Sequence, residues 1–334
     1  MATILRQIAM LTAVGRIAVT GSVAYDTIMV FPGRFRDHII PERAHLLNVS
    51  FQVDQLERRR GGTAANISHN LALLGEHPLL CGAVGAADFD DYAAALEAAG
   101  VDTRHALRAG DVGTATAYIT TDLDDNQITA FFSGAMARAR NLDLTALEDV
   151  SDVVVGADDP VGMARHVEEC AALDARLTFA PAQQIPSLDD AVLRSGLAAA
   201  WLVVGNDYEL DMIRQRTGLS ADDISAHATV AVTHGAAGSE LHHKNGVIHV
   251  AAATAARVVD PTGAGDAYIA GLLAGLRRGA SLEASGRLAA AVASFAVEQP
   301  GPQGHSFDTA QLTERYASAF GDAPAGLLGH RDPA

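Results

Sequence analysis

The chain alternates between short runs of β-branched residues and longer segments in which Ala and Leu recur at helical spacing. A short apolar run followed by a helical segment is typical of a strand buried in a parallel sheet. We therefore predict an α/β fold, in which a doubly wound and mostly parallel sheet is flanked by helices. The predicted strands include "RIAVTGS" (16–22), "SDVVVGA" (151–157), "AAAWLVVGN" (198–206) and "TVAVTHG" (229–235).

Two stretches break this rhythm, because polar and apolar residues alternate in them with a period of two. They are 45–59 and 113–132, and the second contains a turn signal at 124–126 that predicts a hairpin. Strands without intervening helices do not belong in a parallel sheet, so we predict a separate small β-sheet that forms a lid. The predicted division is an N-terminal extension (1–14), a main domain (15–323) with lid segments at about 31–60 and 111–134, and a C-terminal tail (324–334).

Composition and charge narrow the possible partners. The 334 residues, 49% of them hydrophobic, can bury a full core, and the formal net charge of −16 disfavours nucleic acid and anionic membrane surfaces. No apolar run approaches the roughly 20 residues that span a bilayer. Cys81 and Cys170 lack CxxC spacing, which predicts two buried thiols in a reducing cytoplasm. We therefore expect a cytoplasmic protein without a nucleic-acid or membrane partner.

The segment "VVDPTGAGDAYIAGLLAGL" (258–276) changes from β-branched residues through Pro and Gly to a helical pattern. The helix is expected to begin at about Gly265, which leaves the N–H groups of Gly263, Ala264 and Gly265 free at the positive end of the helix dipole. Such a helix start binds anions. Asp266 then has two possible roles. It is either an ordinary first-turn acid or the general base for a hydroxyl that attacks a bound phosphate.

A second Gly-rich helix start lies in "RRRGGTAANISHNLALLG" (58–75). Gly62 permits a close backbone approach, and Asn66 offers both a donor and an acceptor. Upstream, "GSVAYD" places Ser22 and Asp26 just past the carboxyl end of a strand, where open α/β sheets bind ligands. Because Asp26 can accept hydrogen bonds from two vicinal hydroxyls, these segments indicate a polyhydroxy ligand.

Together these three segments resemble the ribokinase-type (PfkB) carbohydrate kinase family. "RGGTAANISHNLALLG" is similar to the first signature of that family, and "DPTGAGDAYIAGLLAGL" is similar to the second, which is highly specific. The resemblance covers about residues 15–320. It implies an ATP-dependent kinase with a ribokinase-like fold, in which the two period-two segments cover the substrate. It also implies that Asp266 is the catalytic base and that the γ-phosphate is held by Gly263, Ala264 and Gly265.

Further elements of the family can be matched one at a time. "NDYE" resembles the family's Asn-x-x-Glu element, which implies that Asn206 and Glu209 hold Mg²⁺ and the phosphates through water. The loop at Asp260 resembles a monovalent-cation site of some relatives, which implies K⁺. "VTHGAAG" resembles the strand and turn that carry ATP, which implies contacts from Thr233, Gly235 and Gly238.

The acceptor is indicated by a likeness, within the family, to bacterial adenosine kinases. The likeness is carried by segments such as "VSFQVDQL", which contains Ser50, and "FAPAQQ". Gln183 and Gln184 can hydrogen-bond a purine edge or ribose oxygens, and the likeness implies that Phe131 stacks on a base. We therefore expect transfer of the γ-phosphate of ATP to the 5′-hydroxyl of a purine nucleoside, adenosine in particular.

Two other functions stay open at this point, and a third is disfavoured. A sugar kinase acting on a pentose, hexose or sugar phosphate fits the same signatures, because Ala117 stands where a second stacking partner is expected. A non-catalytic nucleoside sensor would use the same fold. A dinucleotide-binding dehydrogenase would need a GxGxxG register, which "GAVGAADF" (82–89) lacks. For both kinase functions, the partner is a small molecule. The bare face of the lid predicts a homodimer.

Overall fold

The computed structural model describes residues 15–39 and 49–328. Within them, the central sheet has eight strands, and the strands from β12 to β4 run parallel, whereas β13 and β14 form an antiparallel hairpin at one edge. This topology confirms the predicted α/β fold with a mostly parallel sheet. The strand order is β14 (Gly246–Val250), β13 (Ser239–His243), β12 (Thr229–Thr233), β11 (Ala200–Asn206), β10 (Arg176–Ala180), β9 (Val150–Gly156), β1 (Arg16–Thr20) and β4 (Leu79–Cys81).

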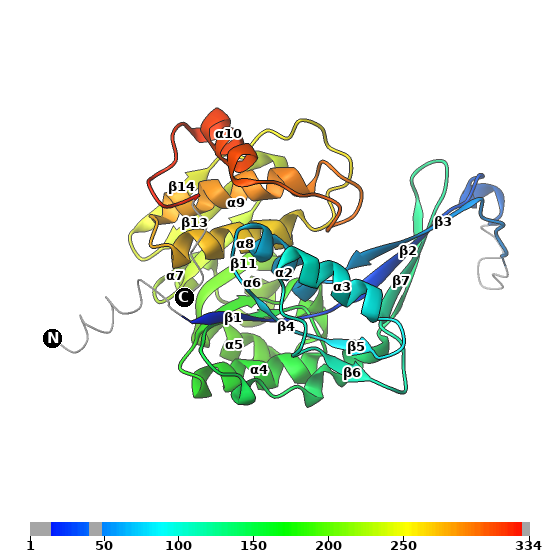
Figure 1. The fold of residues 1–334 in the computed structure, drawn as a ribbon, viewed down its shortest axis with the longest axis horizontal. Coiled ribbons are helices and arrows are strands. Elements are labelled where there is room, and N and C mark those ends of the chain that lie inside the picture. Colours follow the sequence, from blue (N-terminus) through cyan, green and yellow to red (C-terminus); the bar gives the residue numbers. More distant parts are fainter. Residues whose placement is uncertain (1–14, 40–48, 329–334) are drawn as a thin grey trace.

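Helices cover both faces of this sheet (Figure 1). The alternation along β1 shows why, since Ile17 and Val19 pack into one hydrophobic core and Ala18 packs into the other. Burial on both faces explains why these strands are continuous apolar runs in the sequence. The first core is covered by α2 (Thr63–Leu73), α3 (Asp90–Ala99), α8 (Ala264–Arg277), α9 (Leu282–Ala296) and α10 (Thr309–Phe320), and the second by α4 (Pro160–Ala172), α5 (Asp190–Ala199), α6 (Asp207–Thr217) and α7 (Ala221–Ser225).

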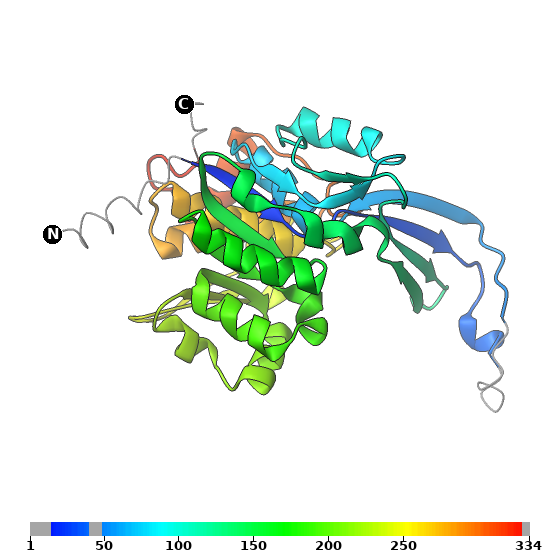
Figure 2. The same cartoon turned by 90° about the horizontal axis from the view of Figure 1, so that it is seen from below.

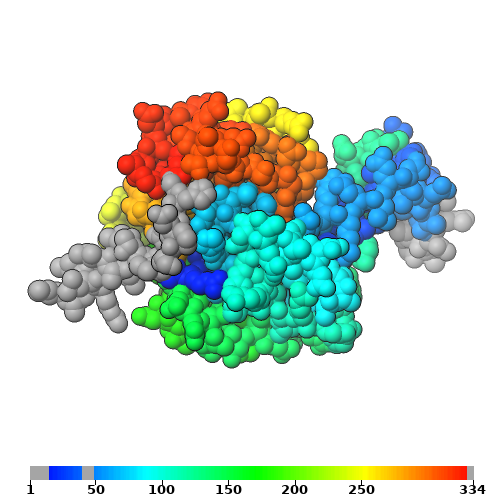
Figure 3. Space-filling view, in the orientation of Figure 1, coloured from blue at the N-terminus to red at the C-terminus, as the bar shows by residue number. Residues whose placement is uncertain are grey.

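A separate small sheet projects from the main body, as Figures 1 and 2 show from two directions and Figure 3 shows in outline. This confirms the predicted second sheet. Its hairpin turns at the predicted place. There Asp125 has a φ of 59°, and the Asp122 carboxylate accepts hydrogen bonds from the N–H groups of Asp124 and Asn126. The strand order in this sheet is β3 (Gln55–Gly61), β2 (Ala24–Val30), β7 (Ala115–Thr121) and β8 (Gln127–Phe132). A separate two-stranded sheet is formed by β5 (Ala83–Gly85) and β6 (Leu107–Ala109).

The strands of the small sheet differ from the predicted segments in two places. β2 begins at Ala24, upstream of the expected start at about 31, because the chain passes from β1 into β2 without a helix. Asp26 therefore lies within a strand of the small sheet and not in a loop after β1. The alternation expected from 45 produces a strand only from Gln55, where pairing with Val30 begins, and residues 40–48 lie outside the described part of the chain.

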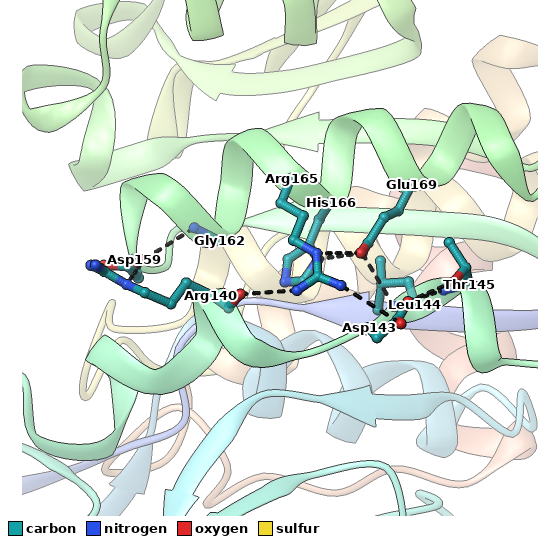
Figure 4. Close-up of polar contacts among 9 residues, drawn as sticks. All are labelled: Arg140, Asp143, Leu144, Thr145, Asp159, Gly162, Arg165, His166 and Glu169. Carbon is teal, nitrogen blue, oxygen red and sulfur yellow. Dashed lines mark hydrogen bonds and ion pairs between the residues drawn. The ribbon is translucent and has the colours of Figure 1, made fainter.

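A cluster of polar contacts fixes the segment that leaves the small sheet to helix α4 (Figure 4). The buried Glu169 carboxylate accepts hydrogen bonds from Arg165 (2.5 Å) and from the backbone N–H of Leu144 (3.2 Å), which begins the turn η4 (Leu144–Ala146). Arg140, in η3 (Gly134–Asn141), pairs at 2.6 Å with Asp159, the N-cap of α4. The cluster therefore anchors the end of β8 to the main domain. The other 3-10 turns within the described residues are η1 (Phe35–Asp37), η5 (Ala182–Ser187) and η6 (Gly235–Ala237).

The C-terminal boundary also differs from the prediction. Leu327 is buried, and its carbonyl accepts a hydrogen bond of 2.6 Å from Arg278. Leu327 and Leu328 thus pack on the main domain and bury apolar surface that the predicted tail was not expected to bury, whereas residues 324–326 are exposed. The rest of the predicted tail (329–334) and the predicted extension (1–14) lie outside the described residues.

Two expectations about covalent and membrane structure can be compared with the structure. Cys81 and Cys170 are buried and unpaired, as expected. Within residues 15–39 and 49–328, no helix is both long enough and apolar enough to cross a membrane.

Candidate active site

A cavity of about 340 Å³ opens at the carboxyl ends of the parallel strands, beside the start of the small sheet. This is the edge at which open α/β sheets bind ligands. Residues from distant parts of the chain meet there, and ten of those singled out from the sequence line the cavity. They are Asp26, Gly62, Asn66, Gln183, Asn206, Glu209, Thr233, Gly263, Gly265 and Asp266.

The start of helix α8 forms one wall of this cavity. Gly263 is the N-cap residue and has a φ of 81°, and a Cβ atom there would lie 2.3 Å from the Cβ of Pro302. Only glycine fits this position. The expected cradle of three free amides is wrong for Ala264, because its N–H donates to the Pro261 carbonyl at 3.2 Å and Ala264 does not line the cavity. The turn that begins the helix occupies this donor, and of the three residues only Gly263 and Gly265 line the cavity.

Asp266 lies in the first turn of α8 and faces helix α2. Its Oδ2 accepts a hydrogen bond of 2.8 Å from Nδ2 of Asn66. Burial raises the pKa of Asp266 to about 7, the hydrogen bond from Asn66 opposes this rise, and the negative charge of Glu209 adds to it. A carboxylate with a pKa near neutrality is well matched to removing a proton from a hydroxyl.

Asp26 reaches the cavity from the small sheet. Burial raises its pKa, the charge of Asp260 adds to the rise, and the charge of Arg59 opposes it. Arg59 lies directly opposite Asp26 on β3 and pairs with Asp260 at 3.2 Å. The Asp260 carboxylate also accepts the backbone N–H groups of Thr262 (3.0 Å) and Gly301 (2.9 Å). Arg59 thus joins the small sheet to the loop before α8, a contact that the run of three arginines in the sequence did not indicate.

Asn206 and Glu209 form a capping box at the start of α6. Asn206 Oδ1 accepts the N–H of Glu209 at 2.8 Å, and Glu209 Oε2 accepts the N–H of Asn206 at 2.9 Å. Burial raises the pKa of Glu209, and the Asn206 N–H opposes the rise. The box uses one oxygen of each side chain, so both residues are rigid where they meet the cavity.

Thr233, at the end of β12, lines the cavity, but the two predicted glycines after it do not. Gly235 and Gly238 shape the turn into β13, with φ values of 56° and 97°. A Cβ atom at Gly238 would lie 2.2 Å from the Val250 carbonyl oxygen, so this glycine is required by the hairpin itself.

Four predicted substrate residues also lie outside the cavity lining. Ser22 is buried, and its Oγ accepts the N–H of Thr63 at 3.1 Å, so it caps the start of α2. Gln184 lies in η5, beside the lining residue Gln183, and Ser50 is exposed ahead of β3. Phe131 is 53% exposed on β8. It pairs with Ala117, which pairs with Asp26, and directly paired residues share a face of a sheet, so Phe131 faces the same side as Asp26.

The site also contains residues that sequence reasoning missed. Thr262, Ile269 and Pro302 line the cavity, and so does Ala182, a non-glycine residue with a φ of 43°. Behind the cavity, Gln303 donates to Oδ1 of Asn66 at 2.8 Å. The sequence "EQPGPQGH" around Gln303 carries no spacing that would have revealed this contact, because its partner is 237 residues away.

Comparison with known proteins assigns the family. Residues 19–310 match the model of the pfkB family carbohydrate kinases, so the chain belongs to this family and is an ATP-dependent phosphotransferase. It is similar to a nucleoside kinase from Methanothermobacter thermautotrophicus, with 31% identity over 283 residues that cover 83% of this chain and 91% of the relative.

Two solved structures of a nucleoside kinase from Burkholderia thailandensis are also similar, both at 38% identity. The complex with inosine has a TM-score of 0.83, and the match covers 93% of this chain and 100% of the relative's chain. The complex with ADP-inosine has a TM-score of 0.81, with 93% and 98% covered.

Proposed function

We propose that this protein transfers the γ-phosphate of ATP to the 5′-hydroxyl of a purine nucleoside. The observation that carries the proposal is the position of Asp266, which combines a pKa of about 7 with a place beside the amides of Gly263 and Gly265. The names of the relatives support a nucleoside as acceptor, and the inosine and ADP-inosine complexes of one relative support a purine. The test is an assay with ATP, Mg²⁺ and purine nucleosides in which the product is identified as the 5′-monophosphate.

In the proposed reaction, Asp26, Gly62 and Asn66 hold the ribose so that its 5′-hydroxyl faces Asp266. The Asp266 carboxylate takes the hydroxyl proton while the hydroxyl oxygen forms a bond to the γ-phosphorus. The bond from that phosphorus to the β,γ-bridging oxygen breaks, and ADP leaves with the electron pair. The amides of Gly263 and Gly265, at the positive end of α8, stabilise the charge on the transferring group.

The residues at the start of α6 fit a magnesium ion, which prefers oxygen ligands and keeps several waters. Glu209 lines the cavity, and its Oε1 is the oxygen that is not used by the capping box. We propose that Glu209 and Asn206 hold Mg²⁺ through water, where the ion neutralises phosphate charge. Thr233 lies at the same edge, and we propose that it contacts ATP, while Gly235 and Gly238 shape the turn beside it.

The surroundings of Asp260 do not fit the monovalent cation suggested by the resemblance. A cation site presents oxygen ligands, whereas this carboxylate is already surrounded by the N–H groups of Arg59, Thr262 and Gly301. The guanidinium of Arg59 supplies the positive charge. We therefore assign no role to K⁺.

The nature of the base is suggested by the two glutamines and by Phe131. A carboxamide both donates and accepts hydrogen bonds, so Gln183 is compatible with the 6-amino group of adenine and with the 6-oxo group of hypoxanthine. We therefore propose that adenosine, the acceptor expected from the sequence, is accepted together with inosine. Gln184 follows Gln183 in η5 and supports it, since its carbonyl accepts the Leu188 N–H at 3.1 Å and so closes the turn.

We propose that the small sheet closes over the bound nucleoside and that a second copy of the chain covers its opposite face. Few side chains are buried in this sheet, and the face opposite Asp26 carries exposed apolar residues. These are Leu56, Tyr118, Ile128 and Phe132.

Hydrogen exchange is expected to detect both contacts. Amides in β3, β7 and β8 should exchange quickly in the dilute, acceptor-free protein, because local opening costs little where few side chains are buried. Adding a purine nucleoside should slow their exchange, and raising the protein concentration without nucleoside should slow it in β7 and β8. Equal exchange with and without nucleoside would argue for a permanently docked sheet.

A further inference from the structure

A chain of buried hydrogen bonds runs from Asp266 away from the cavity. Asn66, Gln303 and Tyr92 form it, and they are 4%, 9% and 1% exposed. Asn66 Nδ2 contacts Asp266 at 2.8 Å, Gln303 Nε2 contacts Asn66 Oδ1 at 2.8 Å and the Tyr92 hydroxyl at 2.6 Å, and that hydroxyl contacts the Gly61 carbonyl at 2.7 Å. The chain connects helices α2, α3 and α8 with the loop before α10.

The direction of every hydrogen bond in this hydrogen-bond chain is fixed by its last member, the bond between Tyr92 and Gly61. The Gly61 carbonyl can only accept a hydrogen bond, so the Tyr92 hydroxyl donates its single hydrogen to it. The oxygen of Tyr92 must then accept one N–H of Gln303, which leaves the other N–H for Asn66. With its oxygen occupied in this way, Asn66 turns its N–H group toward Asp266.

We propose that Gln303 is a positioning residue that holds the Asn66 amide with its N–H group toward Asp266. This inference rests on the proposed role of Asp266 as the base. If the amide turned over, its NH₂ group would meet the NH₂ group of Gln303, and both would lose a partner. Gln303 therefore prevents Asn66 from offering an oxygen to a protonated Asp266, and so favours the carboxylate that can take the proton.

The other residues beside this hydrogen-bond chain do not orient the Asn66 side chain. Asn70 donates to the backbone carbonyl of Asn66 at 2.9 Å and accepts from His305 at 2.8 Å. It therefore supports α2 without contacting the side-chain amide of Asn66. Burial raises the pKa of Tyr92 and lowers that of His305 to about 4, so neither changes charge near neutral pH. The charged group that acts on Asp266 from α6 is Glu209, and Asp26 lines the same cavity from β2.

The pH dependence of kcat/KM tests the proposal. In the wild type, activity should fall as pH drops through about 7, because Asp266 becomes protonated. Gln303→Met frees the amide to turn and accept a hydrogen bond from the protonated acid, so we expect this acid limb to move up by about one pH unit. Asn70→Ala is the matched control. It removes a buried hydrogen bond of the same helix but leaves the Asn66 side chain held, so its acid limb should stay in place even where stability falls.

An acid limb that is unchanged in Gln303→Met, or one that moves equally in Asn70→Ala, would overturn the proposal. If Gln303→Met does not fold, Tyr92→Phe decides, because it keeps the ring and removes the hydroxyl that orients Gln303. Its limb must move in the same direction, by a smaller amount. Failure of the base assignment is distinguishable, since an active Asp266→Asn variant removes the role of Asp266 itself, whereas an inactive one with a normal Gln303→Met limb removes only the role of Gln303.

Discussion

Replacing Asp266 by Asn is expected to lower kcat with a purine nucleoside by at least about 10²-fold, the lower end for loss of a general base. The amide has the same shape and can still pack in the first turn of α8, but it cannot take the proton of the 5′-hydroxyl. The measurements are kcat at saturating ATP and nucleoside, ATP binding by calorimetry, and the melting temperature. ATP binding and the fold should be retained.

The matched control is Glu283→Gln, which removes an exposed acid from the first turn of the neighbouring helix α9. A first-turn acid stabilises a helix by about 0.3–1 kcal/mol through the helix dipole, and Glu283 also pairs with Arg287 one turn further along α9; both contributions are structural. Its kcat should therefore match that of the wild type. Near-normal turnover in Asp266→Asn would reduce Asp266 to the same structural role and would contradict the mechanism.

Replacing Phe131 by Ala is expected to lower kcat/KM for nucleosides by about 10-fold or more while changing any activity on ribose little. Stacking on an aromatic ring contributes about 1–3 kcal/mol per base, and Phe131 shares the face of the small sheet that carries Asp26. The measurement is the ratio of kcat/KM for inosine and for ribose.

Phe132→Ala provides the control for this experiment. Phe132 is the next residue on β8 and lies on the opposite face of the sheet, so its loss should leave the ratio of nucleoside to ribose unchanged. An equal fall for both substrates in Phe131→Ala, or an equal change of the ratio in Phe132→Ala, would show that Phe131 does not contact the base.

The elements of this fold that could be predicted are those whose pattern is local. β1, β9, β11 and β12 are apolar runs because both of their faces are buried, and the start of α8 is marked by its glycines. β2 was harder to recognise, because only three residues (21–23) separate it from β1 in the parallel sheet, and neither length nor composition marks the change of sheet. Period-two alternation did locate the hairpin of β7 and β8, although every residue of β8 is exposed in the structure.

The candidate site was predictable to the extent that it consists of helix starts and strand ends. Asn66 and Asp266 lie in such segments, and their meeting could be expected from the signatures that contain them. Gln303 and Tyr92 are different, because they are 211 residues apart and meet only through the packing of the loop before α10 against α3. Such a hydrogen bond leaves no periodic or compositional trace in the sequence.

The most direct test of the proposed function compares acceptors for the wild-type enzyme under one set of conditions. With ATP and Mg²⁺, adenosine and inosine should be phosphorylated at the 5′-hydroxyl with a kcat/KM well above that of ribose, fructose or a fructose phosphate. If one of these sugars has the higher kcat/KM, the nucleoside assignment is wrong, although the phosphotransferase and its family remain.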